Sequence, residues 1–385
     1  MLKGDDMKTV CIENMCTGCN ACVVKCPVNA IRIEDSVKAI NAVIDTEKCI
    51  GCNACTRVCQ NVDEIDLKTP VAWFQGWDEN NEDRAASSSG GFAHKLATYF
   101  TNNGGLVCSC LFENGKFIYR IVEDSFEVDK FRGSKYVKSD TGNIYITIKE
   151  KLKQGKQVLF IGLPCHVSGL LEFLKGIEHD NLYTVDLICH GSPSKKLLEL
   201  FFCQYKLPLE ALKNIEFRNK GVFQVNSKAI INGNEKNVFR NSKGIKDCYT
   251  IAFLKGLMYT ENCYSCKFAR TERISDITIG DSWGSELSED EKRKGISLAI
   301  CQTKKGIELI KNCGVHIENV NPQKAIVANH QLQAPSVKVQ ERDKFFYLLQ
   351  KGKKFNSAVR KCFLFDCFKQ DIKKLLIKIH ILSYE

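Results

Sequence analysis

The 385-residue chain has no apolar run that approaches the roughly 18 residues of a membrane-spanning helix. It has no apolar segment after Met1 of the kind that directs secretion, and it is too long for a small secreted disulfide scaffold, although it contains 21 cysteines. Aromatic and basic residues are not interleaved, and no nucleic-acid-binding motif is present. These absences argue against a membrane-spanning, secreted or nucleic-acid-binding protein and favour a reducing, cytoplasmic setting.

The net charge of +10 is unevenly distributed along the chain. Residues 1–70 carry a net charge of −2, residues 351–385 carry +6, and the middle of the chain carries the other +6. An acidic first segment attracts basic partner proteins, whereas a basic middle suits an anionic cofactor.

Eight of the cysteines form two copies of the pattern C-x2-C-x2-C-x3-C, 33 positions apart. This is the ligand spacing of two-cluster ferredoxins, in which three cysteines of each copy bind one cubane cluster and the fourth binds the other. We therefore expect two 4Fe–4S clusters, held by a first ferredoxin set (Cys16, Cys19, Cys22 and Cys59) and a second ferredoxin set (Cys49, Cys52, Cys55 and Cys26). Zinc sites use pairs of cysteines rather than such triples, so zinc is not expected here.

The segment resembles the bacterial two-cluster ferredoxin family over about residues 8–70. Gln60 stands where the first copy has Pro27, but the proline of this motif shapes the loop and is not a ligand. Cys11 lies outside the pattern, and we expect it to pack in the core.

Beyond the cysteine repeats, the sequence predicts regular α/β structure. Short apolar runs at 157–161 and 183–188 flank a helical pattern at 166–175, which predicts a parallel βαβ unit. A helix over 91–100, a hairpin around Asn232-Gly233 and strands at 276–279 and 298–301 are also expected. The predicted architecture is an α+β ferredoxin-like two-cluster module (1–70), a linker (71–90), an α/β body with a mixed sheet (91–340, divided near residue 165) and a basic helical tail (341–385).

Four further cysteines lie at predicted strand ends or turns, and we call them the body set: Cys165, Cys189, Cys263 and Cys266. Because the carboxyl ends of neighbouring parallel strands converge, these thiols are candidates for one metal site. Spacing alone leaves a third 4Fe–4S cluster, a zinc ion and buried thiols as alternatives.

The motifs around these cysteines resemble the coenzyme F420 hydrogenase/dehydrogenase beta-subunit family over about residues 85–340. The similar segments occur in the family's order: Gly162-Leu-Pro-Cys165-His, Cys189-His-Gly-Ser-Pro, Cys263-Tyr-Ser-Cys266-Lys and Gly280-Asp-Ser-Trp-Gly284. The resemblance implies that the body set holds a 4Fe–4S cluster beside an FAD, and hence that the body binds flavin. From the residues alone, Gly280–Gly284 is equally consistent with a tight turn, in which Asp281 caps and Trp283 packs, and with a site near the cluster or substrate.

The same resemblance marks two flavin-contacting segments. Ser88-Ser89-Gly90-Gly91 precedes a predicted helix, where glycine backbone N–H groups can approach a phosphate, although such a run is more often a flexible linker. Gly133, Ser134, Lys135 and Tyr136 follow Arg132 and offer a cation, a hydroxyl and an aromatic face, although such a run is more often a solvated loop. His166 replaces the family's usual glutamine, and we expect it to be a hydrogen-bonded core histidine.

The resemblance implies an iron–sulfur flavoprotein oxidoreductase. Such a protein exchanges two electrons with a small molecule through FAD and passes them singly through 4Fe–4S clusters to a redox partner protein. The family name suggests coenzyme F420 as the small molecule; no residue stands out as a catalytic acid or base. Two alternatives stay open: a non-enzymatic electron-transfer subunit, and a zinc- or cluster-binding module without a working flavin site.

The C-terminal tail alternates basic and apolar residues. This pattern fits a helix at a membrane surface, but we favour a helix that packs its apolar stripe on the body and leaves its lysines in water.

Overall fold

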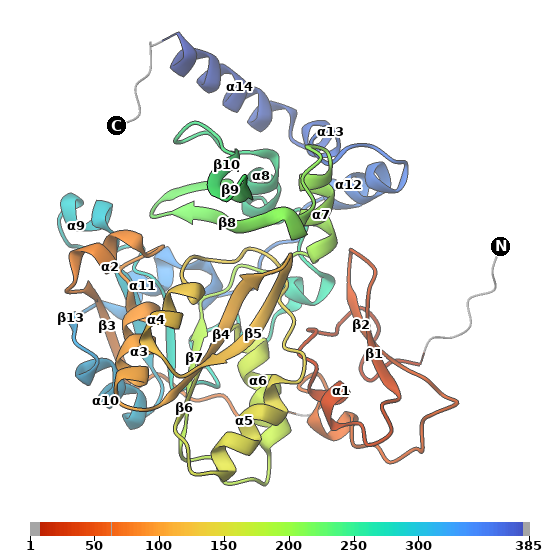
Figure 1. Cartoon of the computed structure of the whole chain (residues 1–385), viewed down its shortest axis with the longest axis vertical. Helices are drawn as coiled ribbons and strands as arrows, with labels where there is room; N and C mark the ends of the chain where they lie inside the picture. The colour runs from red at the N-terminus through yellow and green to blue at the C-terminus, as the bar shows by residue number, and fades with distance from the viewer. Residues whose placement is uncertain (1–7, 63, 380–385) are drawn as a thin grey trace.

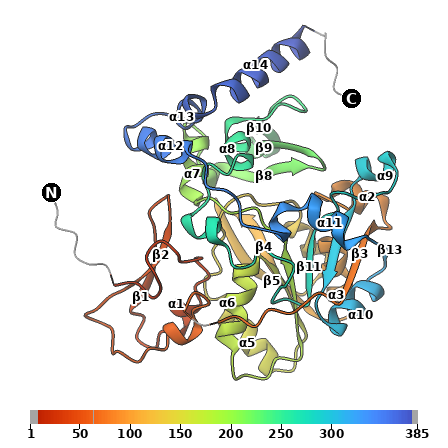
Figure 2. The same ribbon diagram turned by 180° about the vertical axis from the view of Figure 1, so that it is seen from behind.

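The cysteine-rich segment folds into a small domain of loops that lies beside a larger body (Figures 1 and 2). The structure is a computed structural model that describes residues 8–62 and 64–379. The small domain contains a helix, α1 (Ala21–Lys25), a short 3-10 turn, η1 (Thr56–Val58), and an antiparallel hairpin formed by β1 (Ile31–Asp35) and β2 (Ile40–Ile44).

An eight-stranded mixed sheet forms the centre of the body, in the order β13-β3-β12-β11-β7-β6-β4-β5. Strands β4, β6, β7 and β11 run parallel to one another, and the remaining neighbours are antiparallel. The strands are β3 (Ala72–Asp78), β4 (Leu106–Glu113), β5 (Lys116–Val122), β6 (Val158–Gly162), β7 (Leu182–Leu187), β11 (Ile277–Asp281), β12 (Ser297–Cys301) and β13 (Val315–Asn319). All five residues of β6 are buried, as expected of a parallel strand covered on both faces.

Helices cover both faces of this sheet. On one face, α3 (Phe92–Asn102) and α10 (Lys304–Asn312) share a hydrophobic cluster with the strands. On the other face lie α5 (Ile144–Lys153) and α6 (Pro164–Leu174). The βαβ unit β6-α6-β7 predicted from sequence is confirmed, with β6 and β7 paired in parallel.

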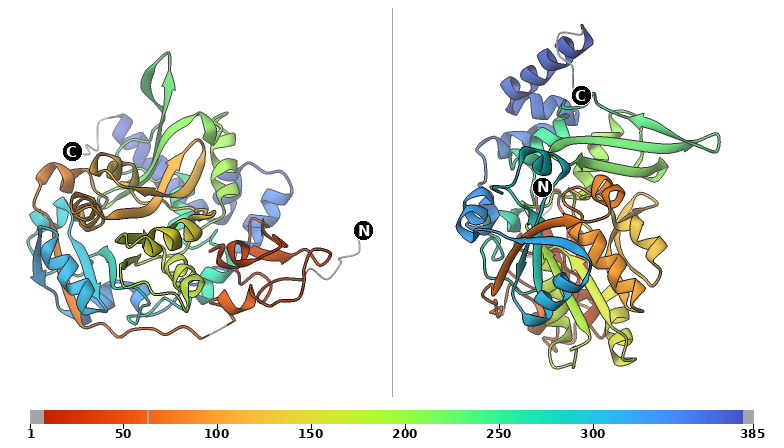
Figure 3. Two further views of the ribbon diagram at one scale, coloured as in Figure 1. Left: turned by 60° about the horizontal axis from the view of Figure 1, so that its bottom comes forward. Right: turned by 90° about the vertical axis from the view of Figure 1, so that its left-hand side faces the viewer.

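A second lobe is built on a three-stranded antiparallel sheet in the order β10-β9-β8 (Figure 3). Its strands are β8 (Leu212–Asn219), β9 (Val222–Ile231) and β10 (Asn234–Phe239), and the predicted hairpin turns at Asn232-Gly233, both at positive φ. Aromatic and aliphatic side chains pack this sheet against α7 (Lys195–Cys203), α8 (Cys248–Leu254), α12 (Glu341–Gln350) and α13 (Phe355–Cys362). The last helix, α14 (Leu364–Lys378), extends from this lobe, and short helices α2 (Asn81–Ala86), α4 (Ser125–Val128), α9 (Glu289–Lys294) and α11 (Pro322–Ala328) complete the chain.

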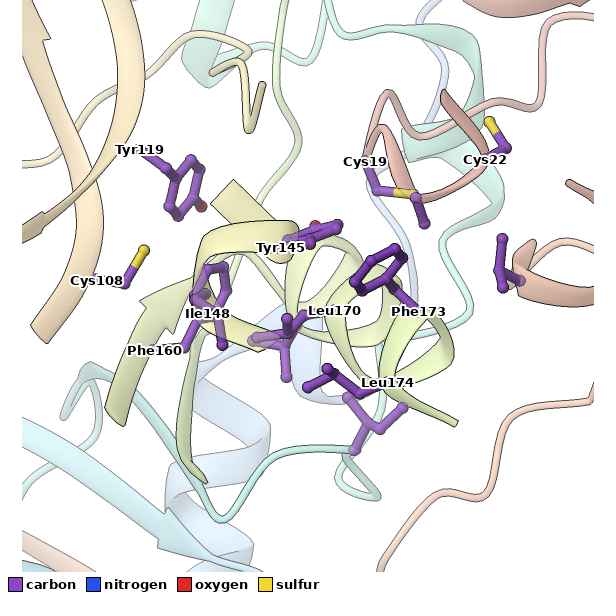
Figure 4. Close-up of a cluster of buried hydrophobic side chains, with 14 of the residues drawn as sticks. Cys19, Cys22, Cys108, Tyr119, Tyr145, Ile148, Phe160, Leu170, Phe173 and Leu174 are labelled. Atoms are coloured by element: carbon purple, nitrogen blue, oxygen red, sulfur yellow. The ribbon is translucent and has the colours of Figure 1, made fainter. Parts of the chain in front are cut away.

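The N-terminal domain packs on the α5–α6 layer of the body. Tyr145 of α5 and Phe173 of α6 belong to the same buried cluster as Cys19 and Cys22, and Figure 4 shows these side chains together. Gly169 of α6 permits the approach, because a Cβ there would lie 2.9 Å from the Cys19 sulfur. The first cysteine loop is therefore packed against the helix layer of the body.

Residues 71–90 differ from the predicted linker, because they contain β3 and α2. Strand β3 lies inside the sheet, paired with both β12 and β13. Its polar residues suggested a solvated segment, but Gln75 and Asp78 are buried with partners: Gln75 Oε1 accepts a hydrogen bond from Ser282 Oγ, and Asp78 pairs with Lys95. The sheet of the body therefore begins at residue 72.

In residues 8–62 and 64–379, none of the helices is both long and apolar enough to cross a bilayer. The predicted helical tail is present as α12, α13 and α14. Helices α12 and α13 bury apolar residues in the second lobe, but the apolar stripe of α14 is exposed, contrary to the packed arrangement that we expected.

Candidate functional site

The first ferredoxin set surrounds one internal cavity of the N-terminal domain. All four of its cysteines line this cavity, together with Cys11 and Gln60. Burial, followed by the nearby thiols of Cys19 and Cys59, raises the pKa of Cys22 above its usual value. A buried group of thiols that face one hollow fits a thiolate-ligated cubane cluster. Cys11, which we expected to have a packing role, packs against the core beside the first ferredoxin set.

The second ferredoxin set lies nearer the surface, and Cys52 is exposed. Its cysteine loop repeats the backbone of the first loop: Gly18 and Gly51 both have positive φ, as do Asn20 and Asn53. Glycine and asparagine are the residues that adopt this left-handed conformation most readily. The sequence repeat is therefore also a repeat of loop geometry, as expected if both loops wrap the same kind of cluster. All 21 cysteines lie in the described residues and carry free thiols.

The body set comes together from three parts of the chain. Cys165 lies in the first turn of α6 after β6, Cys189 follows β7, Cys263 lies within a short 3-10 turn (Glu261–Ser265), and Cys266 directly follows that turn. Burial, followed by the nearby thiols of Cys263 and Cys266, raises the pKa of Cys189 to about 12. The four thiols are thus electrostatic neighbours, but among the described residues no three of their sulfurs lie within 4.8 Å of one another. The sulfurs of a tetrahedral zinc site lie about 4 Å apart, so this wider spacing fits a cubane cluster better than a zinc ion.

Lys138 lies between the body set and the first ferredoxin set. Its Nζ donates a hydrogen bond to Thr17 O at 3.2 Å, and within the described residues it forms no ion pair with a carboxylate. Burial opposes its charge, but thiols of both sets, including those of Cys263 and Cys16, raise its pKa above the usual value. A buried ammonium requires negative charge nearby, and thiolate-ligated metal sites would provide it.

Gln60 also connects the two sets. Its Nε2 donates hydrogen bonds to Cys165 O at 2.7 Å and to Thr17 Oγ1 at 3.2 Å. Because Gln60 follows Cys59 and Thr17 follows Cys16, this side chain joins both ends of the first ferredoxin set to a body-set ligand. The residue that departs from the proline of the first copy is therefore an interdomain contact.

A cavity of about 480 Å³ lies at the carboxyl ends of the parallel strands. Its walls include the ends of β6, β7 and β11, and Cys189 of the body set. This is the edge at which open α/β sheets bind ligands, and the volume lies within the roughly 300–1,000 Å³ of ligand pockets. The buried hydroxyl of Ser192 also lines the cavity and has no hydrogen-bond partner among the described residues, so a donor is available to a ligand.

Both segments that were expected to contact flavin reach this cavity. From these two segments, the residues that line the cavity are Ser88, Ser89, Gly91, Gly133, Ser134, Lys135 and Tyr136. The Ser134 N–H donates to Ser88 Oγ at 3.1 Å, which ties the two segments together. Gly91 precedes α3 with φ +99°, a conformation that favours glycine and aims the first turn of the helix at the cavity.

Gly90 is the one member of the expected set that does not line the cavity. A Cβ at Gly90 would lie 2.4 Å from Gly76 O and 2.5 Å from Ser297 N, so glycine is required there for close packing against β3 and β12. The guanidinium of Arg132 is already paired with Asp83 and Asp129. Lys135 has no carboxylate partner among the described residues, and its Nζ donates hydrogen bonds to Phe131 O and Arg132 O at 2.6 and 2.9 Å. Burial lowers its pKa to about 8, which leaves most of it charged at neutral pH.

Arg218 is a cavity residue that sequence reasoning missed. Its guanidinium donates to both carboxylate oxygens of Asp281, at 2.7 and 2.9 Å, and to Ser88 O at 2.8 Å. It stacks on Phe223, and Tyr136 stacks on Phe253 with ring centroids 4.3 Å apart. Arg218 thus links the second lobe to the flavin-candidate segment and to the end of β11. These contacts span 63 and 130 positions, so no local pattern signals them.

The structure shows features of both interpretations of Gly280–Gly284: residues 282–285 form a turn, in which the Ser285 N–H donates to Ser282 O at 3.2 Å. Asp281 is paired with Arg218 instead of capping a turn, and Trp283 lines the cavity with 40% of its surface exposed. This segment therefore belongs to the wall of the cavity. His166 is a buried core residue whose Nδ1 lies 2.9 Å from the Tyr119 hydroxyl, as expected.

Residues 155–322 match the C-terminal part of the beta subunit in the family described as "Coenzyme F420 hydrogenase/dehydrogenase", and residues 15–61 match the "4Fe-4S dicluster domain". No curated protein matches the chain. The chain is similar to a solved structure of the F420-reducing [NiFe] hydrogenase complex from Methanosarcina barkeri, prepared as a xenon derivative. The identity is 18%, the match covers 69% of this chain and 90% of the other, and the TM-score is 0.48.

Proposed function

The chain belongs to the coenzyme F420 hydrogenase/dehydrogenase beta-subunit family, and we propose that it is an iron–sulfur flavoprotein that links a two-electron reaction to one-electron transfer. The single observation that carries this proposal is the position of Cys189. It lines the cavity into which both flavin-candidate segments project, and it also belongs to the body set. A cofactor in the cavity would therefore lie beside a cluster held by the body set.

The cavity residues suit an FAD. The N-terminus of α3, preceded by Gly91, and the ammonium of Lys135 would bind the diphosphate, since helix N-termini and cations favour anions. Ser88 and Ser134 would orient it, and the Arg218–Asp281 pair would hold the Ser88 segment in place. Bound FAD would exchange a hydride with the substrate and release single electrons to the clusters.

We infer an order for the three cysteine sets between the cavity and the surface. The body set borders the cavity at Cys189. The body set is also next to the first ferredoxin set, with Lys138 and Gln60 between them. The second ferredoxin set reaches solvent, at Cys52. This order supports a path from the cavity to the surface of the N-terminal domain. A redox partner protein would dock near Cys52.

Coenzyme F420 is the first candidate for the small molecule, on the basis of the family. The cavity wall contributes Trp283 and His190 around the space that a two-electron donor or acceptor would enter. Of the two alternatives, an electron-transfer subunit without substrate would share the clusters but lack the two-electron reaction. A zinc module is less consistent with a cavity that joins the body set to two segments suited to a nucleotide.

An anaerobic titration of the purified protein tests the proposal. We expect one of reduced F420, NADH or NADPH to bleach the flavin absorbance, and the signals of reduced 4Fe–4S clusters to follow in electron paramagnetic resonance. If the protein holds FAD but none of the donors reduces it while dithionite does, the electron-transfer alternative becomes the better account. Protein that neither retains nor rebinds FAD would contradict the proposed flavin site.

A further inference from the structure

The C-terminal helix α14 carries an apolar stripe that no other described part of the chain covers. The stripe consists of six large side chains, five in α14 and Ile379 at its C-cap, each between 42% and 78% exposed: Leu364, Phe365, Phe368, Ile372, Leu375 and Ile379. They recur at intervals of three and four residues, with Phe365 beside Leu364, so they lie on one side of the helix. Six exposed large apolar side chains on one helix face mark an interaction surface.

The opposite side of α14 is fixed to the second lobe. Cys367 is buried, and Gln370 Oε1 accepts a hydrogen bond from the Lys246 N–H at 3.0 Å. Asp366 pairs with Lys255 at 3.1 Å, and at the margin of the stripe Asp371 pairs with Arg360 through two bonds of 2.6 and 2.9 Å. These contacts orient α14 so that the stripe faces away from the lobe. Figures 1 and 2 show α14 extending past the three-stranded sheet.

The charges beside the stripe indicate what covers it. At 100° per residue, Lys369 lies about 90° to one side of the centre of the stripe, and Lys378 and Lys374 lie about 90° and 130° to the other side. Asp371 lies about 70° to this second side, nearer the stripe than the lysines, but both acidic residues of α14, Asp366 and Asp371, are paired with basic residues of the lobe. An apolar stripe flanked by lysines on both sides is complementary to a surface that is apolar inside and negatively charged at its edge.

We propose that α14 binds the surface of an anionic lipid bilayer, with the stripe in the acyl boundary and the lysines at the headgroups. This is the geometry of interfacial amphipathic helices, which lie in the plane of the membrane. A second copy of the chain is a poorer occupant, because helix pairing through the stripe would bring the flanking lysines of both copies together. The binding surface is on the second lobe, so the N-terminal domain would stay accessible to a redox partner.

Vesicle flotation of the full-length holoprotein tests this inference. We expect binding to vesicles of phosphatidylcholine mixed with phosphatidylglycerol, little binding to phosphatidylcholine alone, and loss of binding as salt is raised. The triple variant Phe365→Ser, Phe368→Ser and Leu375→Ser should weaken binding by about 100-fold or more, because each substitution removes most of the apolar area that the side chain would bury in the bilayer. The triple variant Lys369→Glu, Lys374→Glu and Lys378→Glu should weaken it by at least about tenfold.

Matched controls distinguish the helix from general surface effects. Phe126→Ser, Val327→Ser and Val337→Ser remove strongly exposed apolar residues elsewhere, and Lys116→Glu, Lys153→Glu and Lys156→Glu reverse exposed charges elsewhere. Both control triples should bind anionic vesicles within about twofold of the unaltered protein, because charges far from the bilayer are screened by salt. Equal binding to neutral and anionic vesicles would overturn the proposal. So would the absence of vesicle binding together with a dimer, seen by sedimentation, that the apolar triple variant loses.

Discussion

Replacing Cys263 by alanine should lower the iron content from about twelve to about eight atoms per chain, since each cubane cluster contains four iron atoms. The flavin should remain, because Cys263 does not line the cavity. A two-electron donor should still bleach the flavin, whereas the ferredoxin clusters should no longer be reduced by that donor. Dithionite should reduce them as before. This combined loss is the largest effect that we expect from any single substitution.

The control for this variant is Cys203→Ala, which removes an exposed cysteine at the end of α7. Its iron content, flavin content and electron transfer should equal those of the unaltered protein. Our partition of the twelve ligands would be wrong if Cys263→Ala also abolished the two ferredoxin signals. It would also be wrong if the iron content were unchanged.

Replacing Lys138 by methionine should lower the reduction potentials of two clusters at once. Lys138 adjoins thiols of both the body set and the first ferredoxin set, and its positive charge stabilises the added electron on either side. A unit charge at about 8 Å in a medium of effective dielectric about 20 contributes about 2 kcal/mol, which corresponds to about 100 mV for one electron. Redox titration followed by electron paramagnetic resonance measures both shifts. The second ferredoxin set should shift much less.

Two further variants separate charge from structure at this position. Lys138→Arg keeps the charge and should restore both potentials to near the original values. Lys267→Met removes an exposed lysine that donates to Gln60 O at 3.0 Å in the same interface, and it should shift the potentials far less. Unchanged potentials in Lys138→Met, with both clusters present, would show that the ammonium does not act on the clusters.

Local sequence patterns predicted most of the elements that carry ligands. Strand β6, helix α6 and strand β7 followed from buried runs and a helical pattern, and these elements place Cys165 and Cys189 near the same sheet edge. The repeated glycine and asparagine of the two cysteine loops adopt the same left-handed backbone. These features depend on short-range conformational preferences, which a sequence displays directly.

The contacts that organise the site were not predictable in this way. Arg218 meets Asp281 and Ser88 across lobes, and Lys138 and Gln60 meet the first ferredoxin set across the domain interface. Such contacts depend on how separate elements pack, and isolated polar residues give no local sign of a distant partner. The polar composition of β3 likewise concealed a strand whose polar groups find partners inside the sheet.

The alternation of basic and apolar residues in the tail could not distinguish a packed helix from an exposed one. In α13 the apolar residues Phe355 and Val359 are buried, whereas in α14 the body is contacted by Cys367 and by polar side chains. The same amphipathic pattern therefore produces a core helix in one case and an exposed stripe in the next. Only the arrangement of the second lobe decides between them.

The central claim is that one chain combines a flavin site with three four-cysteine cluster sites. Iron, zinc and flavin analysis of the anaerobically purified chain tests this claim most directly. Our account predicts about twelve iron atoms, one FAD and no stoichiometric zinc per chain, since three cubane clusters require twelve iron atoms. About eight iron atoms with one zinc and no flavin would contradict it.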